Sequence, residues 1–78
     1  MEQLAKNLLA LRKASNLSRE KVSRVLDLTA KTYERYEKNE QNPTAPTLVK
    51  LADLYNVTLD QLVGRAPLPP HTPLEPPR

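Results

Sequence analysis

Cysteine is absent from this sequence, and glycine and histidine occur once each. Without cysteine there is no disulfide framework and no thiolate zinc site. The lone His71 excludes a metal cluster built on histidines. A single glycine also excludes the glycine-rich loops that bind nucleotide phosphates. We therefore expect no metal and no cofactor. Because no nucleophile is paired with a base, we do not expect an enzyme.

Long apolar runs are missing as well. The stretch Leu8–Leu11 is far too short to span a membrane. Glu2 and Lys6 interrupt the first residues, so a signal peptide is not expected either. These features favour a cytoplasmic protein.

Charge is unevenly distributed over the 78 residues, whose net charge is +3. Residues 1–38 carry nine basic and five acidic side chains, whereas residues 39–66 carry two basic and three acidic ones. A basic half of this kind points to a polyanionic partner, with nucleic acid the first candidate.

Proline is abundant, but six of the eight prolines fall in the last twelve residues. Proline removes backbone donors and fixes φ, so we expect residues 67–78 to form an extended tail. This leaves residues 1–66 as one small folded domain. Residues 73–78 match the PxxPxR pattern that SH3-like grooves bind, which makes the tail a possible protein ligand. A spacer or the start of a linker is, however, the more common role of such an extension.

Apolar residues recur at helical spacing, and no stretch alternates with a period of two. The sequence thus predicts an all-α fold of five short helices, at about residues 2–14, 18–26, 30–38, 45–55 and 59–63. Hydroxyl residues suited to N-caps stand before the last four: Ser18, Thr29, Thr44 and Thr58. Thr58 and Gln61 also fit a capping box.

Only residues 27–29 separate the second and third predicted helices, which favours a helix-turn-helix. The outward face of the third helix would carry Ala30, Lys31, Glu34, Arg35 and Lys38. Tyr33 and Tyr36 would lie on the opposite side. Long donors on one face and anchors on the other suit a helix that enters the DNA major groove.

Several stretches of the sequence follow one another in an order and spacing that indicate a protein family. They are Leu-Arg-Lys at 11–13, Leu-Ser-Arg-Glu at 17–20, Thr-Ala-Lys-Thr-Tyr-Glu-Arg-Tyr-Glu at 29–37, Asn-Pro-Thr at 42–44, Thr-Leu-Val-Lys-Leu-Ala at 47–52 and Val-Thr-Leu-Asp-Gln-Leu-Val-Gly at 57–64. Together they resemble the lambda-repressor-like helix-turn-helix family of the Cro/C1 or Xre type. The resemblance implies a bacterial or phage regulator, associated with the nucleoid. It would bind double-stranded DNA at a near-palindromic operator as a homodimer, more often as a repressor. The alternative is a protein-interaction module, such as an antitoxin or anti-regulator, with DNA secondary.

The resemblance also implies roles for single residues. Base contacts fall to Ala30, Lys31, Glu34 and Arg35, and phosphate contacts to Ser18, Arg19, Thr32 and Lys38. For Glu34 an alternative stays open, because it could instead neutralise Lys31 or Lys38 along the helix. Arg12 and Glu37 match a pair that forms a buried ion bridge in some members.

Several positions depart from the family pattern. Asn16, Asp27 and Asn39 stand where glycine is usual, and all three sites require a left-handed backbone. Ser23 replaces the usual alanine between the second and third helices, so its hydroxyl needs a partner. Tyr33 replaces an aliphatic residue, and we expect its hydroxyl to emerge toward the DNA backbone.

Overall fold

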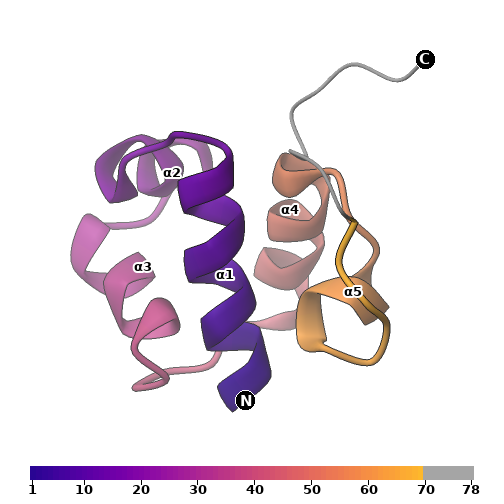
Figure 1. Cartoon of the computed structure of the whole chain (residues 1–78). Helices are drawn as coiled ribbons and strands as arrows, with labels where there is room; N and C mark the ends of the chain where they lie inside the picture. The colour runs from indigo at the N-terminus through magenta and orange to yellow at the C-terminus, as the bar shows by residue number, and fades with distance from the viewer. Residues whose placement is uncertain (70–78) are drawn as a thin grey trace.

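The computed structural model describes residues 1–69, and residues 70–78, most of the expected tail, lie outside the described part. It contains five helices: α1 (Glu2–Ala14), α2 (Arg19–Val25), α3 (Ala30–Glu37), α4 (Ala45–Tyr55) and α5 (Leu59–Val63) (Figure 1). The all-α prediction is confirmed, and each boundary agrees with the predicted one to within a residue. Over residues 1–69, none of these helices has the length and apolar character needed to cross a membrane.

Every predicted N-cap is formed. The hydroxyls of Ser18, Thr29, Thr44 and Thr58 each accept a hydrogen bond from the backbone N–H three residues later. At α5 the capping box is complete, because Gln61 Oε1 also accepts from the backbone N–H of Thr58 at 2.9 Å. A side-chain cap stabilises a helix by about 1 kcal/mol. Helices as short as these need that support.

Left-handed residues join the helices. Asn16, Asp27 and Asn39 have φ of 57°, 59° and 61°, as predicted. Asn56, for which no left-handed backbone was predicted, has φ of 56° at the end of α4. Gly64 ends α5 at φ 91°, and a Cβ there would approach Gln3 Cγ to 2.3 Å. Glycine is therefore required at position 64 for both its backbone and its size.

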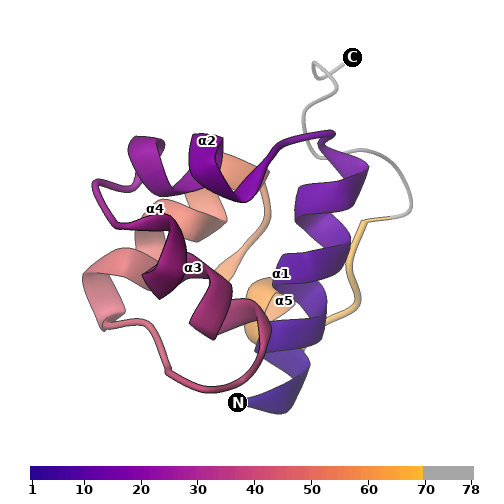
Figure 2. The same ribbon diagram turned by 90° about the vertical axis from the view of Figure 1, so that its left-hand side faces the viewer.

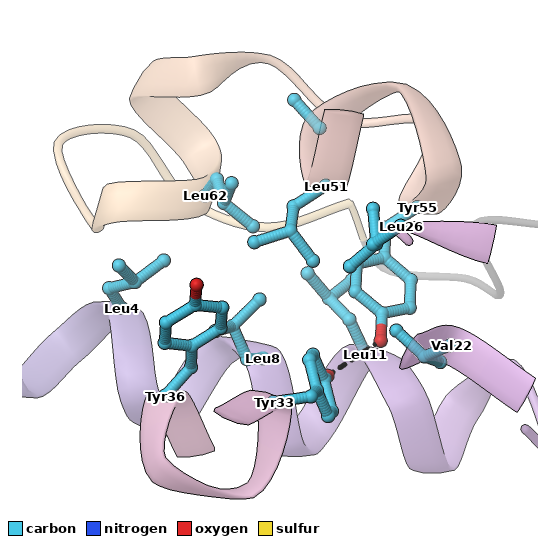
Figure 3. Close-up of a cluster of buried hydrophobic side chains, with 11 residues drawn as sticks. Leu4, Leu8, Leu11, Val22, Leu26, Tyr33, Tyr36, Leu51, Tyr55 and Leu62 are labelled. Carbon is cyan, nitrogen blue, oxygen red and sulfur yellow. Dashed lines mark hydrogen bonds between the residues drawn. The ribbon is translucent and has the colours of Figure 1, made fainter. Parts of the chain in front are cut away.

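The core is mostly aliphatic and lies between all five helices. In the view of Figure 1, α1 runs between α3 on one side and α4 and α5 on the other. Leu8, Leu51 and Leu62 are completely buried where these helices meet (Figure 3). Tyr33 and Tyr36 enter the same core from α3, with their rings edge to face at 6.3 Å. This packing fixes α3 from its inner side.

The chain remains attached to the domain after α5. Gln61 Nε2 donates to the carbonyl oxygen of Pro67 at 3.1 Å, and the half-buried Leu68 packs against the core. The first residues of the expected tail are thus held by the domain. The division at residue 66 stays a prediction.

The turn between α2 and α3 generates the first testable prediction. Asp27 is exposed, and its carboxylate has no hydrogen-bond partner among residues 1–69. Replacing it by glycine should relieve the left-handed strain and raise the free energy of unfolding by about 0.5 kcal/mol. Urea unfolding measures this as a higher midpoint with an unchanged slope.

A matched variant separates backbone strain from charge. Asp27→Asn keeps the shape and the tolerance for positive φ, but removes a negative charge from the C-terminal end of α2. If Asp27→Gly lowers stability, the Asp27 side chain makes a stabilising bond, and our interpretation of the turn is wrong.

Candidate nucleic-acid interface

The outer face of α3 carries the predicted base-contacting residues. Figure 2 shows α3 at the front of the molecule, with α2 above it. Lys31, Arg35 and Lys38 are exposed, and Ala30 is half-buried at the first position of the helix. The structure therefore brings the predicted residues of α3 together on one accessible surface.

Glu34 lies in the middle of this surface and is paired with both neighbouring lysines. Its carboxylate is 3.0 Å from Lys38 Nζ and 3.7 Å from Lys31 Nζ. The hydrogen bond from Lys38 lowers the pKa of Glu34, and the positive charges of Lys38, Lys31 and Arg19 lower it further. In the free protein Glu34 thus neutralises part of the charge on α3, which is the alternative that the sequence left open.

Arg35 differs from both lysines. It is exposed, and within the described residues it has no ion pair or hydrogen bond. Its planar guanidinium can donate two parallel hydrogen bonds to the O6 and N7 acceptors of a guanine. Arg35 is therefore available to a base without first losing a partner.

Ser18 and Thr32, whose hydroxyls are predicted to contact phosphate, each accept a hydrogen bond from a neighbouring residue. Their own hydroxyl protons stay available. Ser18 Oγ accepts from the backbone N–H of Lys21 at 3.0 Å. Thr32 Oγ1 accepts from Thr29 Oγ1 at 3.0 Å. Each can still donate its own proton to a phosphate oxygen. Both lie near a helix N-terminus, where anions are favoured.

A buried carboxylate lies behind this surface, and we name its surroundings the Glu37 cluster: Arg12, Arg19 and Glu37. The Glu37 side chain is only 2% exposed. Arg12 donates from Nε to Oε2 at 2.6 Å and from Nη2 to Oε1 at 3.3 Å, which confirms the expected ion bridge. Arg19 also donates from Nε to Oε1, at 3.1 Å. The hydrogen bond to Glu37 raises the pKa of Arg12.

The participation of Arg19 was not anticipated from the sequence. Arg19 was expected to contact phosphate only, and no local pattern links it to a residue 18 positions further on. Its side chain is nevertheless 40% exposed. Arg19 therefore lies partly in the cluster and partly on the surface beside α3.

Tyr33 packs inward, as its side of the helix predicted, but the expectation for its hydroxyl was wrong. Its hydroxyl does not emerge toward DNA but lies 2.8 Å from the hydroxyl of Tyr55, and both side chains are fully buried (Figure 3). The bond satisfies two polar groups that would otherwise be orphaned in the core. The hydroxyl of Ser23 has the partner it needed, because it donates to the carbonyl oxygen of Glu20 at 2.8 Å.

Asn7 was also missed. It is buried, and its Nδ2 donates to the carbonyl oxygens of Gln61 and Leu62, both at 3.1 Å. The available signal was its position, since a polar residue shares the inward face of α1 with Leu4 and Leu11. Asn7 fastens the end of α5 to α1.

Over residues 1–69, no three acidic or histidine side chains gather where they could hold a metal ion. What the described residues do form is a five-helix domain whose α2, turn and α3 make a helix-turn-helix.

The chain belongs to the Cro/C1-type helix-turn-helix family, whose model, described as helix-turn-helix, matches residues 8–62. The crystal structure of a transcriptional regulator from Listeria innocua is similar, with 29% sequence identity and a TM-score of 0.78. The similarity covers 85% of this chain but only 62% of that one. No curated protein matches. This family membership identifies residues 8–62 as a helix-turn-helix domain of the kind that DNA-binding regulators contain.

The buried tyrosine pair generates a prediction about pH. Burial raises the pKa of Tyr55 from its ordinary value of 10.0 to about 12, and burial also raises the pKa of Tyr33. The unfolded chain therefore releases these protons first. The stability that depends on protonated tyrosines is fully present below pH 10.0 and is lost as the pH rises toward the folded pKa. We expect the free energy of unfolding to fall by roughly 1.4 kcal/mol per pH unit for each buried tyrosine.

Urea unfolding at several pH values below and above 10.0 measures how the free energy of unfolding changes with pH. The matched control is the double variant Tyr33→Phe/Tyr55→Phe, which removes both hydroxyls together and leaves neither orphaned. Its alkaline slope should be much shallower. An equal slope in both proteins would show that other groups cause the alkaline loss.

Proposed function

We propose that this chain is a sequence-specific transcriptional regulator that acts as a repressor and binds a near-palindromic operator as a homodimer. The observation that carries the proposal is the two-sided character of α3. Its inner side is anchored in the core by Tyr33 and Tyr36, while its outer side presents Lys31 and Arg35 to solvent. A rigidly held helix with exposed donors is suited to the major groove.

In the complex, α3 would lie in the groove with Ala30, Lys31, Glu34 and Arg35 toward the base edges. Arg35 would donate to a guanine, and the methyl group of Ala30 would touch a thymine methyl. Lys31 would exchange its weak pairing with Glu34 for a base or phosphate contact. Specificity would then depend mainly on Arg35, because it is exposed and not engaged by another described side chain.

Backbone contacts would come from both sides of α3. Ser18 and Arg19 at the start of α2 would bind one stretch of phosphates, and Thr32 and Lys38 would bind others. Such contacts set the position of a helix on the duplex without reading the sequence. They also make binding depend on salt.

A second copy would place a second α3 in the next major groove, about 34 Å away. The similarity to a transcriptional regulator supports the regulatory role. Leu59, an exposed apolar residue of α5, is a candidate for the contact between subunits. Occupation of the operator would exclude RNA polymerase.

Selection of bound duplexes from a random DNA pool tests the proposal directly. We expect a recovered sequence with two related half-sites. Two cationic phosphate contacts per subunit, Arg19 and Lys38, predict that a dimer loses about 100-fold in affinity between about 50 and 200 mM salt. Failure to enrich any sequence, together with a stable complex with another protein, would instead support an antitoxin or anti-regulator.

Two variants of the full chain test the assignment of roles. Arg35→Ala should relax the preference at one base pair of each half-site, at a cost of about 1–3 kcal/mol on the preferred operator. Arg19→Ala should weaken all duplexes about equally and reduce the salt slope by about 1 per subunit. Equal effects of both variants on sequence preference would contradict these roles.

A further inference from the structure

We propose that Glu37 is a positioning residue for DNA-backbone binding, because its buried carboxylate holds the Arg19 guanidinium in the orientation that presents its free edge to a phosphate. This inference rests on the proposed function and deepens it. In this role Glu37 is neutralised by Arg12 and in turn orients Arg19.

The two arginines of the Glu37 cluster are used differently. Arg12 has all three nitrogens bonded, Nε and Nη2 to Glu37 and Nη1 to the carbonyl oxygen of Leu17 at 3.0 Å. Its side chain is only 12% exposed. Arg19 is bonded through Nε alone, and its side chain is 40% exposed. Among residues 1–69, the two Nη groups of Arg19 have no partner and are left for a ligand.

Charge balance keeps Arg19 attractive to an anion. A lone Glu37–Arg19 pair would be neutral and would gain little from a phosphate. Arg12 already neutralises Glu37, so the whole cluster carries one net positive charge, and the exposed part of it is Arg19. Arg12 thus acts through Glu37 to preserve the charge of Arg19.

The bond also fixes where that charge lies. Arg19 is the first residue of α2 and Glu37 is the last residue of α3. Their hydrogen bond connects the phosphate-binding end of α2 to the helix that would enter the groove. A guanidinium whose plane is already set loses less conformational entropy when DNA binds. The guanidinium can bond Glu37 with Nε and a phosphate with Nη at the same time.

The decisive variant is Arg19→Lys in the full chain, because lysine keeps the charge but cannot hold Glu37 and a phosphate through separate nitrogens. Binding is measured by fluorescence anisotropy on a mixed-sequence duplex long enough for two successive major grooves, and on the duplex recovered by selection. We expect Arg19→Lys to weaken binding to both by about tenfold, as the loss of a charge-assisted hydrogen bond would. The slope of affinity against salt should stay that of the wild type, since the charge is kept.

Arg24→Lys is the matched control. Arg24 lies on the same helix as Arg19 and is exposed, and within residues 1–69 it has no ion pair and no assigned DNA contact. The same exchange of arginine for lysine at position 24 should therefore leave affinity within about twofold. Glu37→Gln is a further variant, and thermal unfolding shows whether it still folds. Because Arg19→Lys leaves the Arg12–Glu37 bridge in place, the test does not depend on Glu37→Gln.

A second measurement needs no DNA. In the NMR spectrum of the free protein, the Nε–H signal of Arg19 should exchange slowly with water, unlike that of the exposed Arg35. Rapid exchange at Arg19 would overturn the positioning role whatever the protein binds. Wild-type affinity in Arg19→Lys would overturn it too, while leaving the proposed function intact. If the wild-type protein binds neither duplex, the proposed function fails, and the proposal that rests on it fails with it.

Discussion

The arrangement of the candidate interface depends on one buried carboxylate. Glu37 is the last residue of α3, and its two oxygens accept from Arg12 of α1 and Arg19 of α2. Taking a carboxylate out of water costs several kcal/mol unless its charge and its lone pairs are all satisfied. The charge and lone pairs of Glu37 are satisfied only while α1, α2 and α3 keep their present relative positions. A shift of one helix would leave a buried charge unpaired, and this penalty adds to the apolar packing that holds the helices in place.

The two faces of α3 carry different kinds of side chain. The inner side of α3 bears Tyr33, Tyr36 and Glu37, all buried, and the Tyr33–Tyr55 hydrogen bond extends the internal polar contacts to α4. The outer side bears cations that solvent reaches. An eight-residue helix is only marginally stable by itself. Both its formation and its orientation therefore depend on contacts with the rest of the domain. The position of the exposed donors is thereby set by contacts on the inner side of α3.

Much of the fold could be predicted because its signals are local. An N-cap needs a hydroxyl at one position, and a left-handed joint needs a residue such as Asn16 or Asp27 that tolerates it. Asn56 could have been found by the same reasoning. The bond from Arg19 to Glu37 and the pairing of Tyr33 with Tyr55 join residues far apart in the chain, and no spacing rule indicates them. Even the Arg12–Glu37 bridge was expected only through a family resemblance. The candidate site was therefore predictable as a face of α3, but not in the contacts that hold it.

The two acidic residues on α3 explain how one helix can be both rigid and adaptable. Glu34 pairs with Lys31 and Lys38 at the surface, where an ion pair contributes little and can be exchanged for a phosphate at small cost. Glu37 pairs with Arg12 in the interior, where loss of a partner is expensive. A ligand that approaches α3 therefore meets cations whose present partners are weak, on a helix whose own anchoring is strong. The proposed binding of DNA would use both, because exchangeable pairs would let the charges move to the ligand while the fixed pair would keep α3 in register with the groove.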